Sequence, residues 1–499
     1  MSLREMLGKQ PKSVTSHVGG RFVGAEGTPI EVVDPAQEAV IALLHEADGD
    51  EVDAAVAAAR SAFDTGPWRG ASITERQRVL MAIHDRIMDH AAELAELETI
   101  NTGIPLTQTQ GMHVPRAAHN FRFFAETINQ LGGEAFTQER DVLSLVTHEP
   151  VGVCALIGPW NMPLGLTAMK IAGALAFGNT CVVKPSELTP LTVARLVELV
   201  ADLLPDGVLN LVNGRGQVTG AALVSHPGID MASFTGGTET GRAILTALAK
   251  GIKRPAMELG GKSASIVFSD ADLDYALDGT LLGSFMNNGQ MCLAGSRIFV
   301  QRPVADAFIE RFAARTRNLK VGDPLQRGTE IGPMINRAQS ERMLRYAETG
   351  AGEGARLLAG GAPYPGGNRG FFAQPTAMLA PDNGLAICQE EIFGPFATLQ
   401  VFDEEEEVIA KANDSDFGLV GYVWTEAMER GLRVSSALRT GTVLVNTPIV
   451  RDLRTGFGGY KMSGLGREGA KGSRAMFTEE KATIIARGKR TFPAMGVSG

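Results

Sequence analysis

The clearest signal of fold class is VGVCALIGPWNMPLGLTAMKIAGALAFGNTCVVKPSE, residues 151–187. An apolar run of strand length is followed by a segment of helix length and then by a second apolar run, TCVVKP. Strands that are buried on both faces of a parallel sheet have this continuous apolar character, because helices cover both faces. The stretch therefore predicts a β-α-β unit of an α/β protein.

The same alternation continues beyond this stretch. Three further apolar runs follow at intervals that accommodate helices: VLNLVN (208–213), MASFTG (231–236) and AMELGG (256–261). Together the runs predict an open, doubly wound parallel sheet, in which nucleotides bind at the carboxyl ends of the strands. A second α/β region is predicted over residues 262–459, with strand-like runs at IFV (298–300), ATLQVF (397–402), VGYVW (420–424) and TVLVN (442–446).

Two segments belong to neither alternating region. Residues 130–149 precede the first sheet, and a tail around TIIAR (483–487) follows the second region. We expect each to contain a strand that pairs outside its own domain. In the part before residue 130, apolar side chains recur at helical spacing, with Asp50 as the expected N-cap of the first long helix. A chain of 499 residues is too long for one core, so two or three domains are expected.

The composition is that of an ordinary globular chain. It is 44% hydrophobic and 21% charged, and a formal net charge of −9 offers no basic surface to a nucleic acid. No apolar run reaches the roughly 18 residues of a membrane span. The N-terminal MSLREMLGKQPKSVTSH lacks the apolar core of a signal peptide. We therefore expect a cytoplasmic protein with neither a nucleic-acid nor a membrane partner.

The four cysteines, Cys154, Cys181, Cys292 and Cys388, lie far apart and form no CxxC pair. They indicate neither a zinc site nor a disulfide framework, and no metal is expected. In a reducing compartment most of them are expected to be small buried hydrophobes. Cys292 differs, because FMNNGQMCLAGSR (285–297) places it in a polar, glycine-containing loop where a substrate can reach a thiolate. A buried inert thiol is the commoner fate of a single cysteine.

Two glycine-rich turns follow strands of the first predicted sheet. FTGGTETG (234–241) opens a predicted helix, and GRGQVTG (214–220) follows the preceding run. Glycines let the backbone approach a pyrophosphate closely, and a helix N-terminus offers unpaired amides to the anion. FTGGTETG departs from the GxGxxG pattern, so a plain turn capped by Thr235 or Thr238 is an equal alternative for this motif alone.

Two further motifs place charged side chains at strand ends. In KPSE (184–187), Lys184 can reach ribose or phosphate oxygens, and Glu187 can accept both ribose hydroxyls while repelling a 2′-phosphate, which favours NAD over NADP. A surface turn is the alternative. In MELGGKS (257–263), Glu258 ends an apolar strand, and a position facing a cleft would raise the pKa of its carboxyl towards neutrality, as suits a general base. An exposed loop glutamate is the alternative.

Together these motifs resemble those of the aldehyde dehydrogenase superfamily over nearly the whole chain. They follow the order of the family, and Glu258 precedes Cys292 by the usual interval between base and nucleophile. The matching motifs are IGPWNMP (157–163), KPSE, FTGGTETG, MELGGKS, the GQMC loop, EEIFGP (390–395), NDSDFGL (413–419) and FGGYKMSGLGRE (457–468).

The resemblance implies NAD-dependent oxidation of an aldehyde to a carboxylic acid. Cys292 matches the nucleophile, and Asn161 matches the side chain that stabilises the oxyanion together with the Cys292 amide. Glu258 matches the base that activates water to hydrolyse the resulting thioester. Lys170 matches a family position near that water.

The resemblance also implies contacts to NAD. Lys184 and Glu187 match contacts to the adenosine ribose, and Glu391 with Phe393 matches the residues that position the nicotinamide. At position 237 many relatives carry Ser in place of the Gly of this chain. The predicted cofactor-binding residues are Ile157, Trp160, Lys184, Glu187, Gly216, Gly237, Thr238, Leu259, Glu391 and Phe393.

The implied fold is α/β: a doubly wound parallel-sheet cofactor domain plus an α/β catalytic domain and a small β oligomerisation arm. The predicted NAD-binding domain comprises residues 1–129 and 150–260, and the catalytic domain residues 261–460. The arm comprises 130–149 and 477–499 and is expected to add a strand to a neighbour's sheet in a homodimer or homotetramer.

The substrate prediction comes from NTPIVRDLRTGFGG (446–459), which resembles a loop of hydroxymuconic and aminomuconic semialdehyde dehydrogenases. Such semialdehydes carry a carboxylate, which the planar fork of an arginine can bind bidentately. The predicted substrate contacts are Arg116, Arg451, Arg454 and Phe457. Surface or inter-subunit ion pairs are the alternative for these arginines.

Other functions stay open on the sequence. A broad-specificity aliphatic or aromatic aldehyde dehydrogenase is the main alternative. A CoA-acylating relative would have no need of Glu258 as a base for hydrolysis. A non-catalytic protein of this fold would place no chemical demand on Cys292 or Asn161, and a cofactor-independent thiol hydrolase would not use the glycine-rich turns or KPSE.

Overall fold

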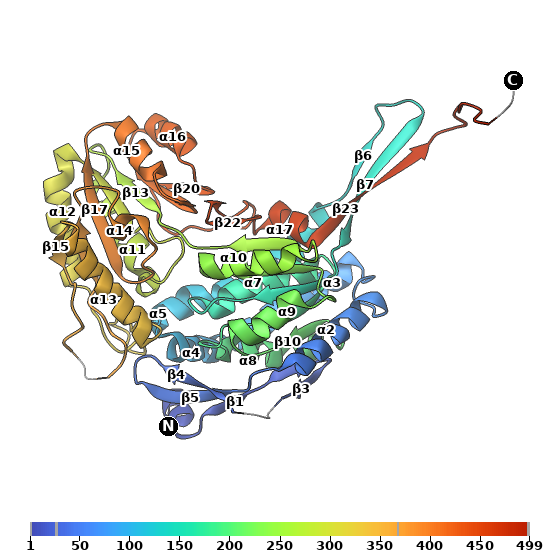
Figure 1. The fold of residues 1–499 in the computed structure, drawn as a ribbon, viewed down its shortest axis with the longest axis horizontal. Coiled ribbons are helices and arrows are strands. Elements are labelled where there is room, and N and C mark those ends of the chain that lie inside the picture. The colour runs from blue at the N-terminus through green and yellow to red at the C-terminus, as the bar shows by residue number, and fades with distance from the viewer. Residues whose placement is uncertain (1, 25–27, 367–368, 497–499) are drawn as a thin grey trace.

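The computed structural model describes residues 2–24, 28–366 and 369–496 (Figure 1). The remaining positions, which fall within the predicted ranges 1–129, 261–460 and 477–499, lie outside the described residues.

The first large sheet has eight strands in the order β22-β12-β11-β8-β9-β10-β2-β3. Its five central strands are parallel and coincide with the five apolar runs of residues 151–261, which confirms the predicted doubly wound sheet. The chain runs from β8 outwards in one direction and then returns to build the other half, so β8 lies beside the topological switch point. The parallel strands are β8 (Val153–Ile157), β9 (Thr180–Lys184), β10 (Leu209–Leu211), β11 (Met231–Thr235) and β12 (Arg254–Glu258). The antiparallel edge strands are β2 (Ser16–Val18), β3 (Arg21–Val23) and β22 (Gly464–Leu465).

Helices cover both faces of this sheet. In β8, Cys154 and Leu156 belong to one core cluster, whereas Val153 and Ala155 belong to another, as the alternation of a strand requires. The first cluster receives α3 (Ile73–Asp89), α4 (Ala91–Thr102), α6 (Val114–Thr127), α7 (Pro163–Ala176) and α8 (Leu191–Val200). The second receives α2 (Gly49–Asp64), α9 (Ala221–Ser225) and α10 (Thr238–Ala249).

The second large sheet has seven strands in the order β15-β16-β17-β14-β13-β19-β20, and all pairs except β15–β16 are parallel. Four strands match the predicted runs: β14 (Arg297–Gln301), β17 (Phe396–Phe402), β19 (Val420–Trp424) and β20 (Thr442–Val445). The others are β13 (Ala264–Val267), β15 (Arg356–Ala359) and β16 (Thr376–Leu379). The flanking helices are α11 (Leu273–Phe285), α12 (Arg302–Arg317), α13 (Arg337–Gly352), α14 (Ala386–Gln389), α15 (Glu405–Asn413) and α16 (Met428–Ala437).

A three-stranded sheet extends away from the body of the molecule (Figure 1). It pairs β6 (Glu134–Phe136) and β23 (Thr478–Ala486) with the two edges of β7 (Val142–Pro150), and α17 (Ala470–Phe477) leads into β23. The two segments that sequence placed outside both α/β regions therefore pair with each other. The predicted domain boundaries stay predictions.

Smaller elements surround the first sheet. The N-terminal part contains α1 (Leu3–Lys9) and a sheet of β1 (Lys12–Val14), β5 (Ala39–Leu44) and β4 (Ile30–Asp34). Asp50 was the wrong N-cap for α2, because the helix begins at Gly49 and the Asp48 carboxylate accepts the Glu51 N–H. The other short elements are α5 (Leu106–Gln108), the π turns η1 (Thr109–His113) and η4 (Gly216–Gly220), the 3-10 turns η2 (Ile128–Gln130), η3 (Ala201–Leu203) and η5 (Met286–Gly289), and the pair β18 (Phe417–Gly418) and β21 (Tyr460–Lys461).

Within the described residues, no helix combines the length and the apolar character needed to cross a membrane. The same residues hold no group of three or more His, Cys, Asp or Glu side chains arranged for a metal ion.

Candidate active site

A cavity of about 370 Å³ brings together side chains from both α/β regions. Asn161, Glu258 and Cys292, which sequence placed in three separate motifs, all line it. Its walls are largely apolar, with methionines, leucines and Tyr422 among the lining residues. A mostly apolar cavity with a few convergent polar groups is the usual form of a small-molecule site.

Cys292 lies in the loop between η5 and β14, and its thiol is only partly exposed. The loop approaches the end of β12 so closely that a Cβ on Gly261 would lie 2.2 Å from the Cys292 carbonyl oxygen. Burial, together with the negative charges of Glu391 and Glu258, raises the pKa of the Cys292 thiol to about 12. The resting sulfur is therefore protonated and must lose its proton when it attacks.

Asn161 lies between β8 and α7 and is 7% exposed. Its Nδ2 donates a 2.8 Å hydrogen bond to the carbonyl of Gln290, two residues before Cys292. An amide nitrogen carries two N–H groups. Among the described residues only this one acceptor is assigned to it, so the second N–H is left to donate towards a substrate oxygen in the cavity.

Glu258 is the last residue of β12, and its Oε2 has no hydrogen-bond partner among the described residues. Burial raises the pKa of its carboxyl well above the ordinary value, and the neighbouring Glu468 raises it further, whereas Lys170 lowers it. A raised pKa makes the Glu258 carboxylate a stronger base, so the group suits proton abstraction near neutral pH.

A buried ion pair lies behind Glu258. Lys170 Nζ, on α7, is 2.8 Å from Glu468 Oε1 and also donates to Ser233 Oγ at 3.0 Å. Glu468 itself lines the cavity. The pair thus holds one cation and one anion close to the candidate base. The Glu468 anion raises the pKa of the Glu258 carboxyl, and the Lys170 cation lowers it.

The carboxyl ends of β9 and β10 carry the residues predicted to bind adenosine. Lys184 Nζ donates to the Pro185 carbonyl at 3.0 Å and lies 3.4 Å from Glu187 Oε2. Burial lowers the pKa of Lys184. The turn η4, which begins at Gly216, packs against this lysine, since a Cβ on Gly220 would lie 3.6 Å from Lys184 Cδ.

The N-terminus of α10 is open to a ligand. Gly237 is the N-cap, and a Cβ placed there would meet nothing within 4 Å. The hydroxyl of Thr238 is buried without a partner among the described residues, as is that of Thr235. Unpaired hydroxyls beside the free amides of a helix N-terminus fit a pyrophosphate, so these residues are compatible with a dinucleotide.

Glu391, Trp160 and Phe393 are among the residues predicted to bind the cofactor, and the structure gives their contacts. Glu391 Oε1 accepts the Gly261 N–H at 3.0 Å, and a Cβ on Gly260 would lie 2.3 Å from Glu391 Oε2, so a larger residue at position 260 would displace the carboxylate. The rings of Trp160 and Phe393 meet edge to face with centroids 5.1 Å apart.

Comparison with known proteins agrees with this geometry. The model of the aldehyde dehydrogenase family matches residues 22–483. The chain belongs to the aldehyde dehydrogenase family. It is 42% identical over 487 residues to a 2-hydroxymuconic semialdehyde dehydrogenase of Pseudomonas sp. (strain CF600), covering 95% of this chain and 99% of that one. It is 42% identical to the 5-carboxymethyl-2-hydroxymuconate semialdehyde dehydrogenase of Escherichia coli, covering 92% of this chain and 98% of that one.

An aldehyde dehydrogenase of Bacillus cereus, solved as its NAD+ complex, superposes with a TM-score of 0.94 at 38% identity and covers 97% of this chain and 98% of that one. These matches confirm the predicted family, the α/β fold class and the enzyme class. NAD is confirmed as a cofactor of the family.

The three candidate arginines of this aldehyde dehydrogenase lie in different environments. Arg116 and Arg451 line the cavity together with Phe457, whereas Arg454 does not line it. The Arg454 side chain is 82% exposed and pairs with Asp452. The structure therefore brings two of the three predicted anchors to the site.

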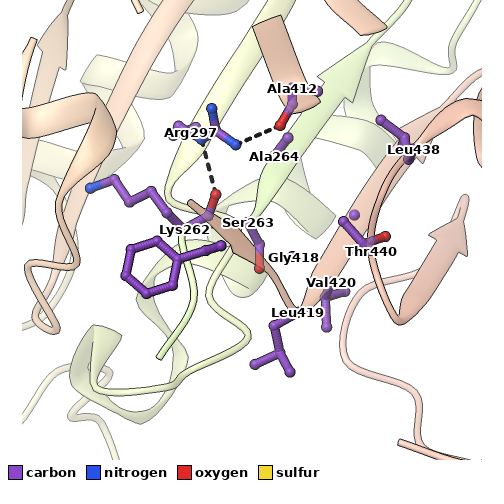
Figure 2. Close-up of a pocket in the computed structure, with 12 residues that line it drawn as sticks. Lys262, Ser263, Ala264, Arg297, Ala412, Gly418, Leu419, Val420, Leu438 and Thr440 are labelled. Atoms are coloured by element: carbon purple, nitrogen blue, oxygen red, sulfur yellow. Dashed lines mark hydrogen bonds between the residues drawn. The ribbon is translucent and has the colours of Figure 1, made fainter. Parts of the chain in front are cut away.

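A second cavity, of about 10 Å³, lies elsewhere in the enzyme (Figure 2). It has room for about one water molecule, and Cys292 does not line it. Arg297 stands at its wall and donates to the Lys262 and Ala412 carbonyls, as the dashed lines in Figure 2 show. Burial lowers the pKa of Lys262 to about 7. The size of this cavity excludes an aldehyde substrate.

Glu468 is the site residue that sequence reasoning did not single out. It is the last residue of the matched FGGYKMSGLGRE motif, and its place there was the available signal. A backbone bridge to Phe457 holds it at the cavity.

Proposed function

We propose that this enzyme oxidises a carboxylate-bearing semialdehyde, such as 2-hydroxymuconic semialdehyde, to a carboxylic acid with NAD+. The observation that carries the proposal is one cavity that Cys292, Asn161 and Glu258 line together with a partly buried arginine, Arg116. The names of the two 42% identical relatives, both semialdehyde dehydrogenases, support it.

The first half of the reaction forms a bond to sulfur. The Cys292 thiol releases its proton to solvent, the sulfur attacks the aldehyde carbon and forms a C–S bond, and the carbonyl π electrons move onto oxygen. The free N–H of Asn161 donates to this oxyanion, together with the Cys292 backbone amide. Bound NAD+ supplies the chemistry of a hydride acceptor, and the carbon left on sulfur is a thioester.

The second half of the reaction hydrolyses the thioester. Glu258 removes a proton from water, the water oxygen attacks the carbonyl carbon, and the C–S bond breaks as the acid leaves. The Cys292 sulfur then recovers a proton. Lys170 and Glu468 are positioned to tune the Glu258 carboxyl, because each shifts its pKa.

Arg116 is the proposed anchor of the substrate carboxylate. Its guanidinium Nε is buried without a partner among the described residues, and burial lowers its pKa. A buried N–H without an acceptor is unfavourable, and a bound carboxylate would supply that acceptor. Arg451 instead donates to the carbonyls of Asp452, Thr455 and Glu468, so we assign it to holding the cavity wall.

The experiment compares two substrates of similar length, 2-hydroxymuconic semialdehyde and hexanal, by the absorbance of NADH. In Arg116→Met, kcat/KM for the semialdehyde is expected to fall about 30-fold or more, which corresponds to a charge-assisted hydrogen bond of about 2 kcal/mol, while hexanal changes little. Arg454→Met, on the exposed arginine, is the matched control and is expected to leave both substrates unaffected.

Equal effects of Arg116→Met on both substrates would contradict the anchor and favour the broad-specificity alternative. Release of free acid without added CoA separates hydrolysis from CoA acylation. Loss of all turnover in Cys292→Ala is expected, and activity in that variant would refute the nucleophile.

We also infer the wider organisation that sequence predicts: a cytoplasmic enzyme with an NAD-binding domain (1–129 and 150–260), a catalytic domain (261–460) and an arm (130–149 and 477–499). The extended β6-β7-β23 sheet supports a homodimer or homotetramer, because its free edges can pair with another subunit.

A further inference from the structure

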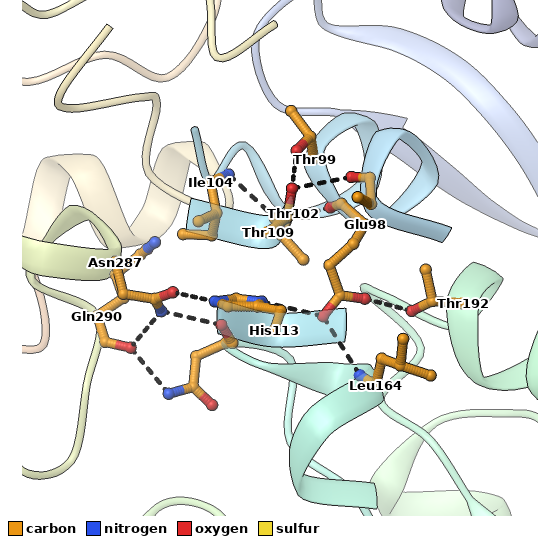
Figure 3. Close-up of polar contacts among 12 residues, drawn as sticks. Glu98, Thr99, Thr102, Ile104, Thr109, His113, Leu164, Thr192, Asn287 and Gln290 are labelled. Atoms are coloured by element: carbon orange, nitrogen blue, oxygen red, sulfur yellow. Dashed lines mark hydrogen bonds and ion pairs between the residues drawn. The ribbon is translucent and has the colours of Figure 1, made fainter. Parts of the chain in front are cut away.

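A buried polar chain runs from α4 to the catalytic loop and takes no part in the chemistry proposed above (Figure 3). It joins Glu98 on α4, His113 in η1 and Asn287 in η5, and it ends at the backbone carbonyls of Asn161 and Gln290. The three side chains are at most 1% exposed. Polar groups so deeply buried destabilise a fold unless they are hydrogen-bonded. The hydrogen-bond partners of Glu98, His113 and Asn287 therefore show which segments these side chains hold in place.

At one end, Glu98 fixes the orientation of the imidazole. Its carboxyl accepts the Thr192 hydroxyl at 2.5 Å and the backbone N–H of Leu164 at 3.3 Å. His113 Nδ1 lies 3.2 Å from Glu98 Oε1. Leu164 is in the first turn of α7, whose dipole favours a carboxyl there. The ring of His113 is thus tied to the helix that carries Lys170.

At the other end, Asn287 clamps two segments of the active site. Its Nδ2 donates to the Asn161 carbonyl at 2.9 Å and to the Gln290 carbonyl at 3.2 Å. Oδ1 must therefore be the atom that faces His113 Nε2 at 2.8 Å, and Nε2 must carry a proton. The backbone of Asn287 has φ +58°, a left-handed conformation that asparagine tolerates better than most residues.

The direction of the Asn287 amide decides whether the clamp works. If its oxygen and nitrogen exchanged places, Oδ1 would face two carbonyl oxygens and both hydrogen bonds would be lost. The N–H at His113 Nε2 opposes this exchange because it can donate to an oxygen but not to the NH2 group of the Asn287 amide. The Gln290 carbonyl also receives Asn161 Nδ2, so both ends of Asn161 are fixed against the loop of Cys292.

We propose that Glu98 and His113 are positioning residues of the oxyanion site: they hold the Asn287 amide in the one direction that fixes Asn161 against the Cys292 loop. The inference rests on the proposed function, because it assigns the oxyanion to Asn161 and the nucleophile to Cys292. His113 does not itself line the substrate cavity, and it reaches the site through Asn287, which does line it.

Two substitutions test the two contacts of His113 separately, because each keeps a nitrogen at the place of only one ring nitrogen. In His113→Gln, the amide nitrogen reaches the place of Nε2 and can still donate to Asn287 Oδ1. In His113→Asn, the shorter amide reaches only the place of Nδ1, beside Glu98. His119→Leu, on the exposed face of the neighbouring helix α6, is the control for loss of a histidine.

Two reagents report on Cys292 in the full-length enzyme. Acylation by p-nitrophenyl acetate passes through a tetrahedral oxyanion, whereas alkylation by iodoacetamide forms none. For His113→Asn we expect acylation to fall about 10- to 100-fold, towards the loss seen when an oxyanion donor is removed, with alkylation within about threefold of wild type. His113→Gln is expected to recover acylation to within about fivefold, and His119→Leu to leave both rates unchanged.

Equal acylation in His113→Gln and His113→Asn would overturn the proposal, and so would a parallel loss of alkylation, since that indicates a collapsed loop. If His113→Asn does not fold by circular dichroism, Asn287→Ala replaces it with the same expectation and the same refuting outcomes. Peptide mass mapping of the acetylated wild-type enzyme locates the acyl group. An acyl group away from Cys292 would count against the proposed function itself.

Discussion

Glu258→Gln is expected to stop the reaction after the thioester has formed. Glutamine preserves the volume of the side chain but cannot accept a proton. In the structure the Glu258 Oε2 is free of partners among the described residues, and burial with Glu468 holds the pKa well above its usual range, which makes the carboxylate an effective base. Loss of a positioned general base lowers a rate by about 10²- to 10⁴-fold, or roughly 3 to 5 kcal/mol in the hydrolytic barrier.

Rapid mixing of the variant with NAD+ and semialdehyde is the assay. We expect a burst of about one NADH per active site, because acylation does not need this base, followed by turnover slowed by the factor above. Glu348→Gln, an exposed glutamate on α13, is the control and should behave as wild type. A slow steady state without a burst would show that Glu258 acts before the thioester, and unchanged turnover would remove it as the base.

The raised pKa of Glu258 also fixes the sign of the pH dependence. The protonated carboxyl cannot take a proton from water, so hydrolysis is lost as pH falls through this pKa. Because burial and Glu468 raise the pKa, the loss occurs well above the pH at which an ordinary glutamate, with a pKa of 4.5, titrates.

Two further predictions concern the reactivity of the Cys292 thiol and the packing of α10. Because the Cys292 pKa is about 12, alkylation by iodoacetamide is expected to rise about tenfold per pH unit from about pH 7 to 10, and a plateau near neutrality would contradict the burial argument. Gly241→Ala on α10 would place a Cβ 2.6 Å from Leu259 Cδ2, whereas Gly283→Ala on α11 meets nothing within 4 Å. Chemical denaturation is expected to show the first variant destabilised by about 1 kcal/mol and the second stabilised by up to about 1 kcal/mol; equal stabilities would contradict the close packing.

The parallel strands could be predicted because each is a short, uninterrupted apolar run followed by glycines or charged residues. Among the missed strands, β15, RLLA, lacked that signal, because it is exposed at two of its four positions and forms an antiparallel edge. The arm was recognisable only as sequence that fitted neither alternating region. The N-cap of α2 is Asp48 and not the expected Asp50, and the two positions are hard to distinguish in sequence because both are aspartates that precede the helical repeat.

That Cys292, Asn161 and Glu258 line one cavity could be predicted because each lies in a motif whose local sequence suits the proposed chemistry. Glu468, by contrast, is held by a contact with Lys170 that spans 298 positions. The link from His113 to Asn287 spans 174 positions and depends on which amide atom faces the ring. Arg454 and Arg116 are equally plausible anchors in sequence, and only burial distinguishes them. Contacts of this kind are set by packing and leave no local pattern.

The proposed mechanism requires a thioester on Cys292. Peptide mass mapping of enzyme quenched during turnover of semialdehyde with NAD+ detects the acyl group directly. The Glu258→Gln variant should show the acyl group of the substrate on the peptide that contains Cys292, in amounts equal to the NADH burst. An acyl group on another residue, or NADH formed with no acyl group on any peptide, would contradict the account.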